Sequence, residues 1–338
     1  VTMCAIFYQN KITTILIFGL ALLICGSVGC GMEFPSPPPN LFYKANVLRV
    51  GKGPADLLTV DLNLDGSLDL VSANAKNNTL SILLGKGDGA FREVLTFQVA
   101  SEPTTIATGD VNRDGIPDLL TNARGAGQFT ALLGYGNGSF RRLPGIRTGK
   151  VPLAIIPADF DNDGKLDVAV TLTFDKMEIF LGSGNGTFKK KETYLTGSRS
   201  LSGVVGDFGG DGNIDIALAT SSSASSAIRL YKGMGDGTFS KPKIFAKDLV
   251  PLTLIKKDMN NNGLQDLIFS AGQGDNMYML LSRGDGTFEK GIAFSGGGGP
   301  TALTAGHFNS DNQVDIAVAN SRSSNFSLVV RTANGFFH

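Results

Sequence analysis

The sequence predicts an all-β protein, a β-propeller whose blades each contain about four short strands. Three observations predict this fold: a motif that recurs six times, two further marks that keep the same phase, and strand-like segments after each motif. The motif is Asp-x-[Asp/Asn]-x-[Asp/Asn]-Gly-x-x-Asp, and successive copies begin 48 to 51 residues apart. The copies begin at Asp61, Asp110, Asp159, Asp207, Asp258 and, in degraded form, His307. A fixed period of this length is typical of propellers and solenoids.

A phenylalanine and a proline each stand at a constant distance from the motif. A phenylalanine stands nineteen residues before every copy, at Phe42, Phe91, Phe140, Phe188, Phe239 and Phe288. A proline stands seven residues before five of the six copies, and Ser200 replaces it in the fourth unit. The differences in unit length therefore fall between each motif and the next phenylalanine, as expected of a surface loop that tolerates insertion.

The segments between these marks have the pattern of strands. After each motif come about four apolar or small residues without helical periodicity, such as 168–171, which is typical of strands buried on both faces. A second strand ends in Leu-Leu-Gly-x-Gly-[Asp/Asn]-Gly-x-Phe, as at 83–91 and 132–140. Its glycines supply the positive φ of a tight hairpin. Each unit thus offers about four strands, which is one propeller blade.

The phase of the repeat also predicts how the ring closes. The sixth unit stops just after its hairpin, so it lacks an outer strand, whereas the leading segment 42–50 is such a strand with no unit before it. Pairing the two would satisfy the exposed backbone groups of both edges. We therefore expect a single propeller domain over 42–338, with six blades closed by the strand 42–50. A propeller with a seventh, divergent blade is the alternative.

The motif itself has the composition of a cation-binding loop. Oxygen-bearing side chains stand at positions 1, 3, 5 and 9, a glycine stands at position 6, and position 7 offers its carbonyl whatever its side chain. Ca²⁺ takes six to eight oxygen ligands, including a backbone carbonyl. An EF-hand is excluded, because position 12 lies in a strand and is not Glu. Plain Asx turns are the alternative, but carboxylates gathered without a cation would repel one another.

The predicted ligands follow from the motif positions. In the first three loops they are Asp61, Asn63, Asp65, Ser67 and Asp69; Asp110, Asn112, Asp114, Ile116 and Asp118; and Asp159, Asp161, Asp163, Lys165 and Asp167. In the fourth loop Gly209 stands at position 3, which leaves Asp207, Asp211, Asn213 and Asp215. The fifth loop has Asp258, Asn260, Asn262, Leu264 and Asp266, and its two carboxylates predict weaker binding.

The sixth loop departs furthest from the motif. His307 replaces the first Asp and Asn312 replaces the glycine, which leaves metal binding by His307, Asn309, Asp311 and Asp315 an open question. Over the whole chain we expect three to five Ca²⁺ ions that stabilise folding and take no part in catalysis.

Together, the Asp loops and the Gly-x-Gly-[Asp/Asn]-Gly-x-Phe turns resemble the FG-GAP/VCBS-type repeats of bacterial surface proteins and of the integrin α-subunit β-propeller. The resemblance covers 42–338. It implies that each loop joins the first two strands of a blade and holds calcium. It also implies a surface module for binding or adhesion.

The N-terminal residues resemble an export signal. Lys11 is the one charge in the first 30 residues, and the apolar stretch 12–24 is shorter than the roughly 20 residues of a membrane span but suits a signal peptide over 1–29. The residues before Cys30 resemble a bacterial lipoprotein signal, which implies acylation of Cys30, with simple secretion or an uncleaved anchor as alternatives. Residues 30–41, which are rich in proline, would form a tether. The expected location is the outer membrane or cell surface, with the periplasm or the medium as the alternative.

Composition limits the function further. The 30 Lys and Arg residues balance 30 Asp and Glu residues, which argues against a nucleic-acid partner. Only two histidines are present, and all three cysteines precede residue 31, so a three-His zinc site and a cysteine nucleophile in the propeller are excluded. We expect no enzyme, but a module that binds a protein or glycan through its blade-end loops, such as 124–128 and 221–226, and that meets the membrane only through a lipid anchor. A polysaccharide lyase or hydrolase and a structural component of an envelope complex are the alternatives.

Overall fold

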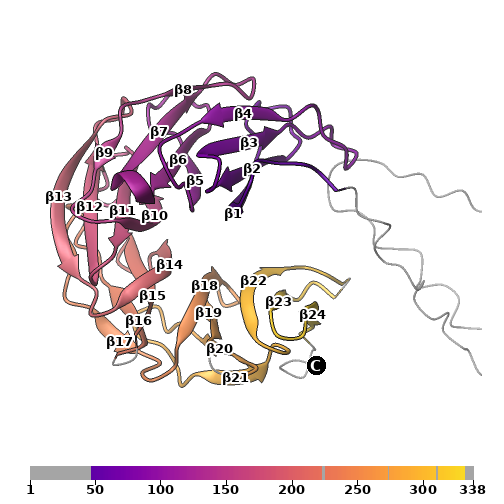
Figure 1. The fold of residues 1–338 in the computed structure, drawn as a ribbon. Coiled ribbons are helices and arrows are strands. Elements are labelled where there is room, and N and C mark those ends of the chain that lie inside the picture. Colours follow the sequence, from indigo (N-terminus) through magenta and orange to yellow (C-terminus); the bar gives the residue numbers. More distant parts are fainter. Residues whose placement is uncertain (1–46, 223–224, 273, 310, 332–338) are drawn as a thin grey trace, which may run out of the picture. The chain divides into compact units, whose positions relative to one another are not determined.

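The computed structural model describes residues 47–222, 225–272, 274–309 and 311–331, which belong almost entirely to one compact unit, Arg49–His338. Apart from the short 3-10 helix η1 (Arg124–Ala126), every regular element in these residues is a β-strand. The strands form six antiparallel sheets that follow one another in chain order, with β1, β5, β10, β14, β18 and β22 on the inner side (Figure 1). The predicted all-β, six-bladed propeller is confirmed.

The sheets are called blades 1 to 6, in chain order. Blade 1 contains β1 (Pro54–Val60), β2 (Asp69–Asn74), β3 (Thr79–Leu83) and β4 (Leu95–Gln98). Blade 2 contains β5 (Ile106–Gly109), β6 (Asp118–Ala123), β7 (Gln128–Gly134), β8 (Phe140–Arg142) and β9 (Ile146–Arg147), where β8 and β9 both pair with β7. Blade 3 contains β10 (Pro152–Ala158), β11 (Asp167–Leu172), β12 (Lys176–Gly182) and β13 (Phe188–Leu195).

The other three blades repeat this order. Blade 4 contains β14 (Arg199–Gly206), β15 (Asp215–Ser221), β16 (Ala227–Tyr231) and β17 (Lys243–Phe245). Blade 5 contains β18 (Pro251–Lys257), β19 (Asp266–Ala271), β20 (Asn276–Leu280) and β21 (Ile292–Ser295). Blade 6 contains β22 (Pro300–Gly306), β23 (Asp315–Asn320) and β24 (Asn325–Val329).

The hydrophobic core lies between neighbouring blades. The second strand of a blade is buried along nearly its whole length, as in β11, because the blades on both sides cover its two faces. The repeated phenylalanine contributes to these contacts. Phe239 of blade 4 packs edge-to-face on Phe160 of blade 3, with ring centroids 5.4 Å apart, and Phe140 of blade 2 packs on Phe97 of blade 1 at 5.6 Å. The repeated phenylalanine thus joins one blade to the preceding one.

The predicted closure of the ring is not tested in full. Residues 42–46 of the closing strand lie outside the described residues, residues 47–50 form no strand, and the described part of blade 6 has three strands. Pairing of 42–50 with blade 6 therefore stays a prediction. The predicted signal peptide 1–29 and the tether 30–41, with Cys30, also lie outside the described residues. Within the described residues, no helix has the length and apolar character to span a membrane.

Candidate metal-binding loops

The six Asp loops all lie at the same end of the blades. Each one connects the first strand of its blade to the second, as 159–166 connects β10 to β11, and this agrees with the expected position. The backbone turns sharply at position 6, where Gly66, Gly115 and Gly164 have φ between 77° and 84°. Glycine adopts this conformation without strain. The repeat therefore folds into the same compact turn in successive blades.

The Asp at position 1 folds the loop around its own carboxylate. In the third loop, Asp159 Oδ1 accepts the N–H of Asp163 at 3.2 Å, and Oδ2 accepts the N–H of Gly164 at 2.8 Å. The same pair of bonds forms at Asp61, Asp110, Asp207 and Asp258. In the sixth loop His307 cannot accept them, and its Nδ1 lies 2.8 Å from the carbonyl oxygen of Gln313.

The Asp at position 9 fastens the loop to the neighbouring hairpin. Asp118 is fully buried, and its Oδ2 accepts the N–H of Val111 at 2.9 Å while its Oδ1 accepts the N–H of Gly134 at 2.7 Å. The first bond is to position 2 of the loop, and the second is to the start of the glycine hairpin 16 residues further on. Equivalent pairs of bonds occur at Asp69, Asp167, Asp215, Asp266 and Asp315. We call this arrangement the carboxylate clamp.

The clamp explains why Asp persists at position 9 in the sixth loop, where the first Asp and the glycine are lost. Asp315 is fully buried and accepts the N–H groups of Phe308 and Arg331 at 3.1 and 3.0 Å. Buried backbone donors must be satisfied whether or not a cation is present. Sequence reasoning assigned position 9 only to the metal and missed this role. The retention of Asp315 in a degraded loop was the signal that pointed to it.

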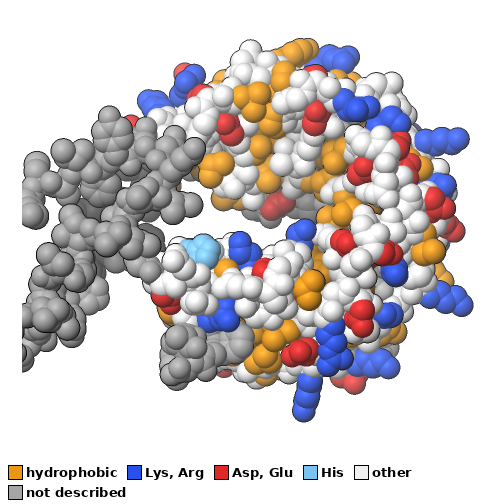
Figure 2. Space-filling view, turned by 180° about the vertical axis from the view of Figure 1, so that it is seen from behind, with side chains coloured by type: hydrophobic (Ala, Val, Ile, Leu, Met, Phe, Trp, Pro, Cys, Tyr) orange, Lys and Arg blue, Asp and Glu red, His pale blue; other side chains and the backbone are white. Residues whose placement is uncertain are grey.

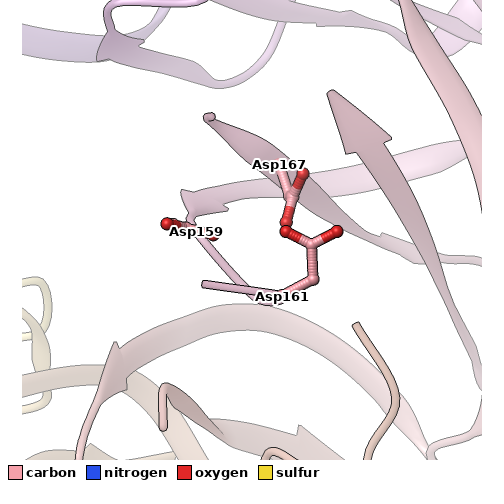
Figure 3. A group of neighbouring side chains, drawn as sticks. All are labelled: Asp159, Asp161 and Asp167. Carbon is pink, nitrogen blue, oxygen red and sulfur yellow. The ribbon is translucent and has the colours of Figure 1, made fainter. Parts of the chain in front are cut away.

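The third loop brings three acidic side chains together. Asp159, Asp161 and Asp167 each present a carboxylate oxygen, and these oxygens lie within 4.8 Å of one another. Figure 3 shows Asp161 facing Asp167, with Asp159 on the other side of the loop. Because Ca²⁺–oxygen distances are about 2.3–2.6 Å, two ligands of one ion lie at most about 5 Å apart. These three side chains satisfy that limit. The fourth carboxylate, Asp163, forms an ion pair with Lys165.

The electrostatics of this triad favour a cation. Burial raises the pKa of Asp167 to about 6, although the N–H groups of Gly182 and Phe160 oppose the shift, and the negative charges of Asp161 and Asp159 raise it further. Burial and the neighbouring charge of Asp163 also raise the pKa of Asp161. Each ionised carboxylate thus disfavours ionisation of the next, and a divalent ion would remove that penalty. The residues present fit calcium.

The other loops hold fewer carboxylates. In the first two, an asparagine stands at position 3, and its amide donates to the position-5 carboxylate, from Asn63 to Asp65 at 2.9 Å and from Asn112 to Asp114 at 2.8 Å. The fourth loop pairs Asp211 with Lys232 at 3.0 Å. The fifth has carboxylates only at Asp258 and Asp266. Among the described residues, the third loop alone gathers three acidic side chains as closely as its triad does.

The raised pKa of Asp167 predicts a pH dependence in chelator. Its folded pKa of about 6 lies above its ordinary value of 3.8, so the folded state binds the proton more tightly than the unfolded state does. The contribution of Asp167 to stability is therefore fully present below about pH 4 and lost as pH rises through 6. A carbon-detected NMR titration in EDTA should show one carboxyl that titrates near pH 6, and Asp167→Asn should remove it. A titration midpoint near 4 would contradict the prediction.

The fold and these loops define a six-bladed propeller with repeated oxygen-rich turns. Three stretches of the chain, 61–121, 159–218 and 258–318, match the FG-GAP-like repeat family, and together they cover more than half of the sequence. Each stretch begins at the first Asp of a loop and ends in the second strand of the next blade. The chain therefore belongs to the FG-GAP-like repeat family, and the expected resemblance is confirmed to that extent.

Solved structures share the fold at low sequence identity. A protein from Bacteroides uniformis, described as a proposed 6-phosphogluconolactonase, has a TM-score of 0.64 and 16% identity over 86% of this chain and 85% of its own. A protein from Lactobacillus plantarum has a TM-score of 0.63 and 16% identity over 86% and 85%. An Agrocybe aegerita lectin that recognises non-reducing terminal N-acetylglucosamine has a TM-score of 0.58 and 16% identity over 85% and 79%. No curated protein matches the sequence.

Proposed function

We propose that this protein is an exported propeller, stabilised by calcium, that binds a protein or glycan ligand and catalyses no reaction. The acidic triad of the third loop is the observation that carries the calcium part of the proposal. The ligand part is supported by a hollow at the opposite end of the blades, described below. Export and a lipid anchor at Cys30 rest on the sequence of the N-terminal segment.

Calcium would be held by the oxygens of the Asp loops. In the third loop these are the carboxylates of Asp159, Asp161 and Asp167, and the first two loops offer similar sets with an asparagine at position 3. The ion supplies positive charge to a group of carboxylates that otherwise repel one another. Three to five ions per chain remain the proposed number.

The chemistry of the acidic residues supports binding over catalysis. A general acid or base must exchange protons with a substrate, but the buried Asp at position 9 of every described loop already accepts two backbone N–H groups. The face in Figure 2 carries Lys, Arg, Asp and Glu side chains interspersed. Proteins that bind nucleic acid usually carry a patch of positive charge on one face. The mixture of charges therefore supports a partner other than nucleic acid.

A hollow between blades 4 and 5 is the proposed place for a ligand. It has a volume of about 130 Å³ and lies where β14 and β18 begin and β15 ends, so it is a strand length away from the Asp loops. Its walls are mainly aliphatic, and Leu201 is 53% exposed. The lining residues are Arg199, Leu201, Ala219, Ser221, Pro251 and Leu252.

Arg199 distinguishes this hollow from the rest of the repeat. At the equivalent position, directly before the proline mark, the other units carry Gly53, Glu102, Val151, Val250 and Gly299. Arg199 takes part in none of the ion pairs between described residues. The fourth unit also has the longest interval to the next motif, and Ser221, the first residue of its serine-rich segment 221–226, lines the hollow. These departures from the repeat gather at one end of one blade.

The decisive experiment is a glycan array and a pull-down with residues 42–338 in millimolar calcium, repeated with Arg199→Gln. We expect the wild type to retain a defined glycan or protein, and the variant to bind it at least about tenfold more weakly, because a hydrogen bond to a charged group is worth about 1.5–3 kcal/mol. Arg147→Gln, which removes an exposed arginine on β9, is the matched control and should bind normally. Turnover of a polysaccharide by the wild type would overturn the proposal in favour of an enzyme.

A further inference from the structure

The fourth loop lacks one predicted ligand of the repeat. Position 3 carries an oxygen-bearing side chain in the other five units, at Asn63, Asn112, Asp161, Asn260 and Asn309. In the fourth unit it is Gly209. The loop still contains three carboxylates, on Asp207, Asp211 and Asp215, and still forms the carboxylate clamp through Phe208 and Gly233. It therefore folds like the others but has a gap in its ring of oxygens.

The same unit departs from the repeat at a second position that faces the loop. The residue directly before the clamped hairpin N–H is apolar in the other units, at Leu84, Leu133, Leu181, Leu281 and Val330. In the fourth unit it is Lys232, which directly precedes Gly233. The fourth unit thus lacks an oxygen ligand at position 3 and has a lysine in the facing hairpin. The lysine of the third loop, Lys165, stands at position 7 and pairs with Asp163, which is not part of the acidic triad.

The end of the Lys232 side chain lies beside Gly209 and Asp211. Its Nζ lies 3.0 Å from Asp211 Oδ2. A Cβ placed on Gly209 would lie 3.5 Å from Lys232 Cε, 3.7 Å from Nζ and 3.4 Å from Asp215 Oδ2. The end of the Lys232 side chain therefore lies in van der Waals contact with the point where a third-position side chain would begin, next to the space that such a side chain would enter. The hydrogen bond and charge of Asp211, followed by the charges of Asp215 and Asp207, raise the pKa of Lys232.

We infer that Lys232 is the resident cation of the fourth loop, which folds without calcium. A calcium ion placed among the same carboxylates would meet the ammonium charge at close range, and the two cations would repel each other. With one ligand missing as well, the fourth loop does not fit calcium as the third loop does. The inference rests on the proposed calcium binding of the other loops and replaces, for the fourth loop, the expectation that Asp207, Asp211, Asn213 and Asp215 hold a metal.

The test compares Lys232→Leu, which restores the residue type of the other blades, with Lys241→Leu, which removes an exposed lysine of the same blade. Thermal unfolding is followed by circular dichroism in EDTA. We expect Lys232→Leu to lower the melting temperature in EDTA and Lys241→Leu to leave it unchanged. Equal melting temperatures of the wild type and Lys232→Leu in EDTA would overturn the inference, whether or not any loop binds calcium.

The second measurement counts ions by native mass spectrometry and calorimetry. We expect the double variant Gly209→Asp/Lys232→Leu to bind one more Ca²⁺ ion than the wild type, and to regain in calcium the stability that it loses in EDTA. As single substitutions, Asp207→Asn should leave the number of bound Ca²⁺ ions unchanged, whereas Asp159→Asn should lower it by one. A drop of one ion for Asp207→Asn would overturn the inference. If neither the wild type nor any variant bound calcium, the calcium part of the proposed function would be wrong. The melting temperatures in EDTA would still test the role of Lys232.

Discussion

Asp118→Ala should destabilise the propeller by about 2 to 6 kcal/mol, one of the two largest effects that we expect from this structure. The substitution removes the carboxylate clamp of blade 2 and leaves the buried N–H groups of Val111 and Gly134 without an acceptor. Each unsatisfied buried donor costs about 1–3 kcal/mol. Urea unfolding in the presence of calcium measures the loss directly.

Asp315→Ala separates the clamp from the metal. The sixth loop keeps the clamp but lacks the first Asp and the glycine, so the loss of stability should be the same in calcium and in EDTA. Asp88→Ala is the matched control, since Asp88 lies in an exposed hairpin and accepts the single N–H of Ala90. If Asp315→Ala cost no more than Asp88→Ala, the structural role of position 9 would be wrong.

Removal of calcium by a chelator should destabilise the protein by roughly 4 to 8 kcal/mol. This range applies to three sites and to a starting calcium concentration about 10 to 100 times their dissociation constant. The reason is mass action, because an ion that binds only the folded state adds to its stability. Weak sites with dissociation constants on the order of 10⁻⁴ to 10⁻³ M are typical outside cells, so millimolar calcium is the relevant range. Thermal unfolding against calcium concentration measures the effect.

The control for chelation is Asp161→Asn, which removes one carboxylate of the triad but has little effect on the clamp of Asp167. It should reduce the calcium-dependent stabilisation while leaving stability in EDTA equal or higher, because burial and a like charge already disfavour the ionised form of Asp161. An unchanged calcium response in this variant would place the ion elsewhere.

The periodic features could be predicted from the sequence because they depend on local spacing. The six copies of the Asp motif predicted six blades, with a seventh as the alternative, and the glycine at position 6 predicted the turns that the structure contains. The position of each loop between the first two strands was implied by the resemblance to FG-GAP/VCBS-type repeats. Such features need no knowledge of which distant residues meet.

The features that were missed depend on contacts between distant parts of a blade. The second bond of the clamp joins Asp118 to the backbone N–H of Gly134, 16 residues away, and no side chain marks that donor in the sequence. Lys232 and Gly209 are separated by 23 positions, and only the fold shows that they lie next to each other. The ion pair between Lys165 and Asp163 in the third loop was not predicted, because position 7 was expected to contribute only its backbone carbonyl.

A crystal structure of residues 42–338 grown in millimolar calcium tests the central claim most directly. We predict an ion in the third loop within about 2.3–2.6 Å of oxygens from Asp159, Asp161 and Asp167, and the ammonium of Lys232 beside Asp211 in the fourth. A third loop that holds only water under these conditions, with its three carboxylates turned apart, would contradict the account.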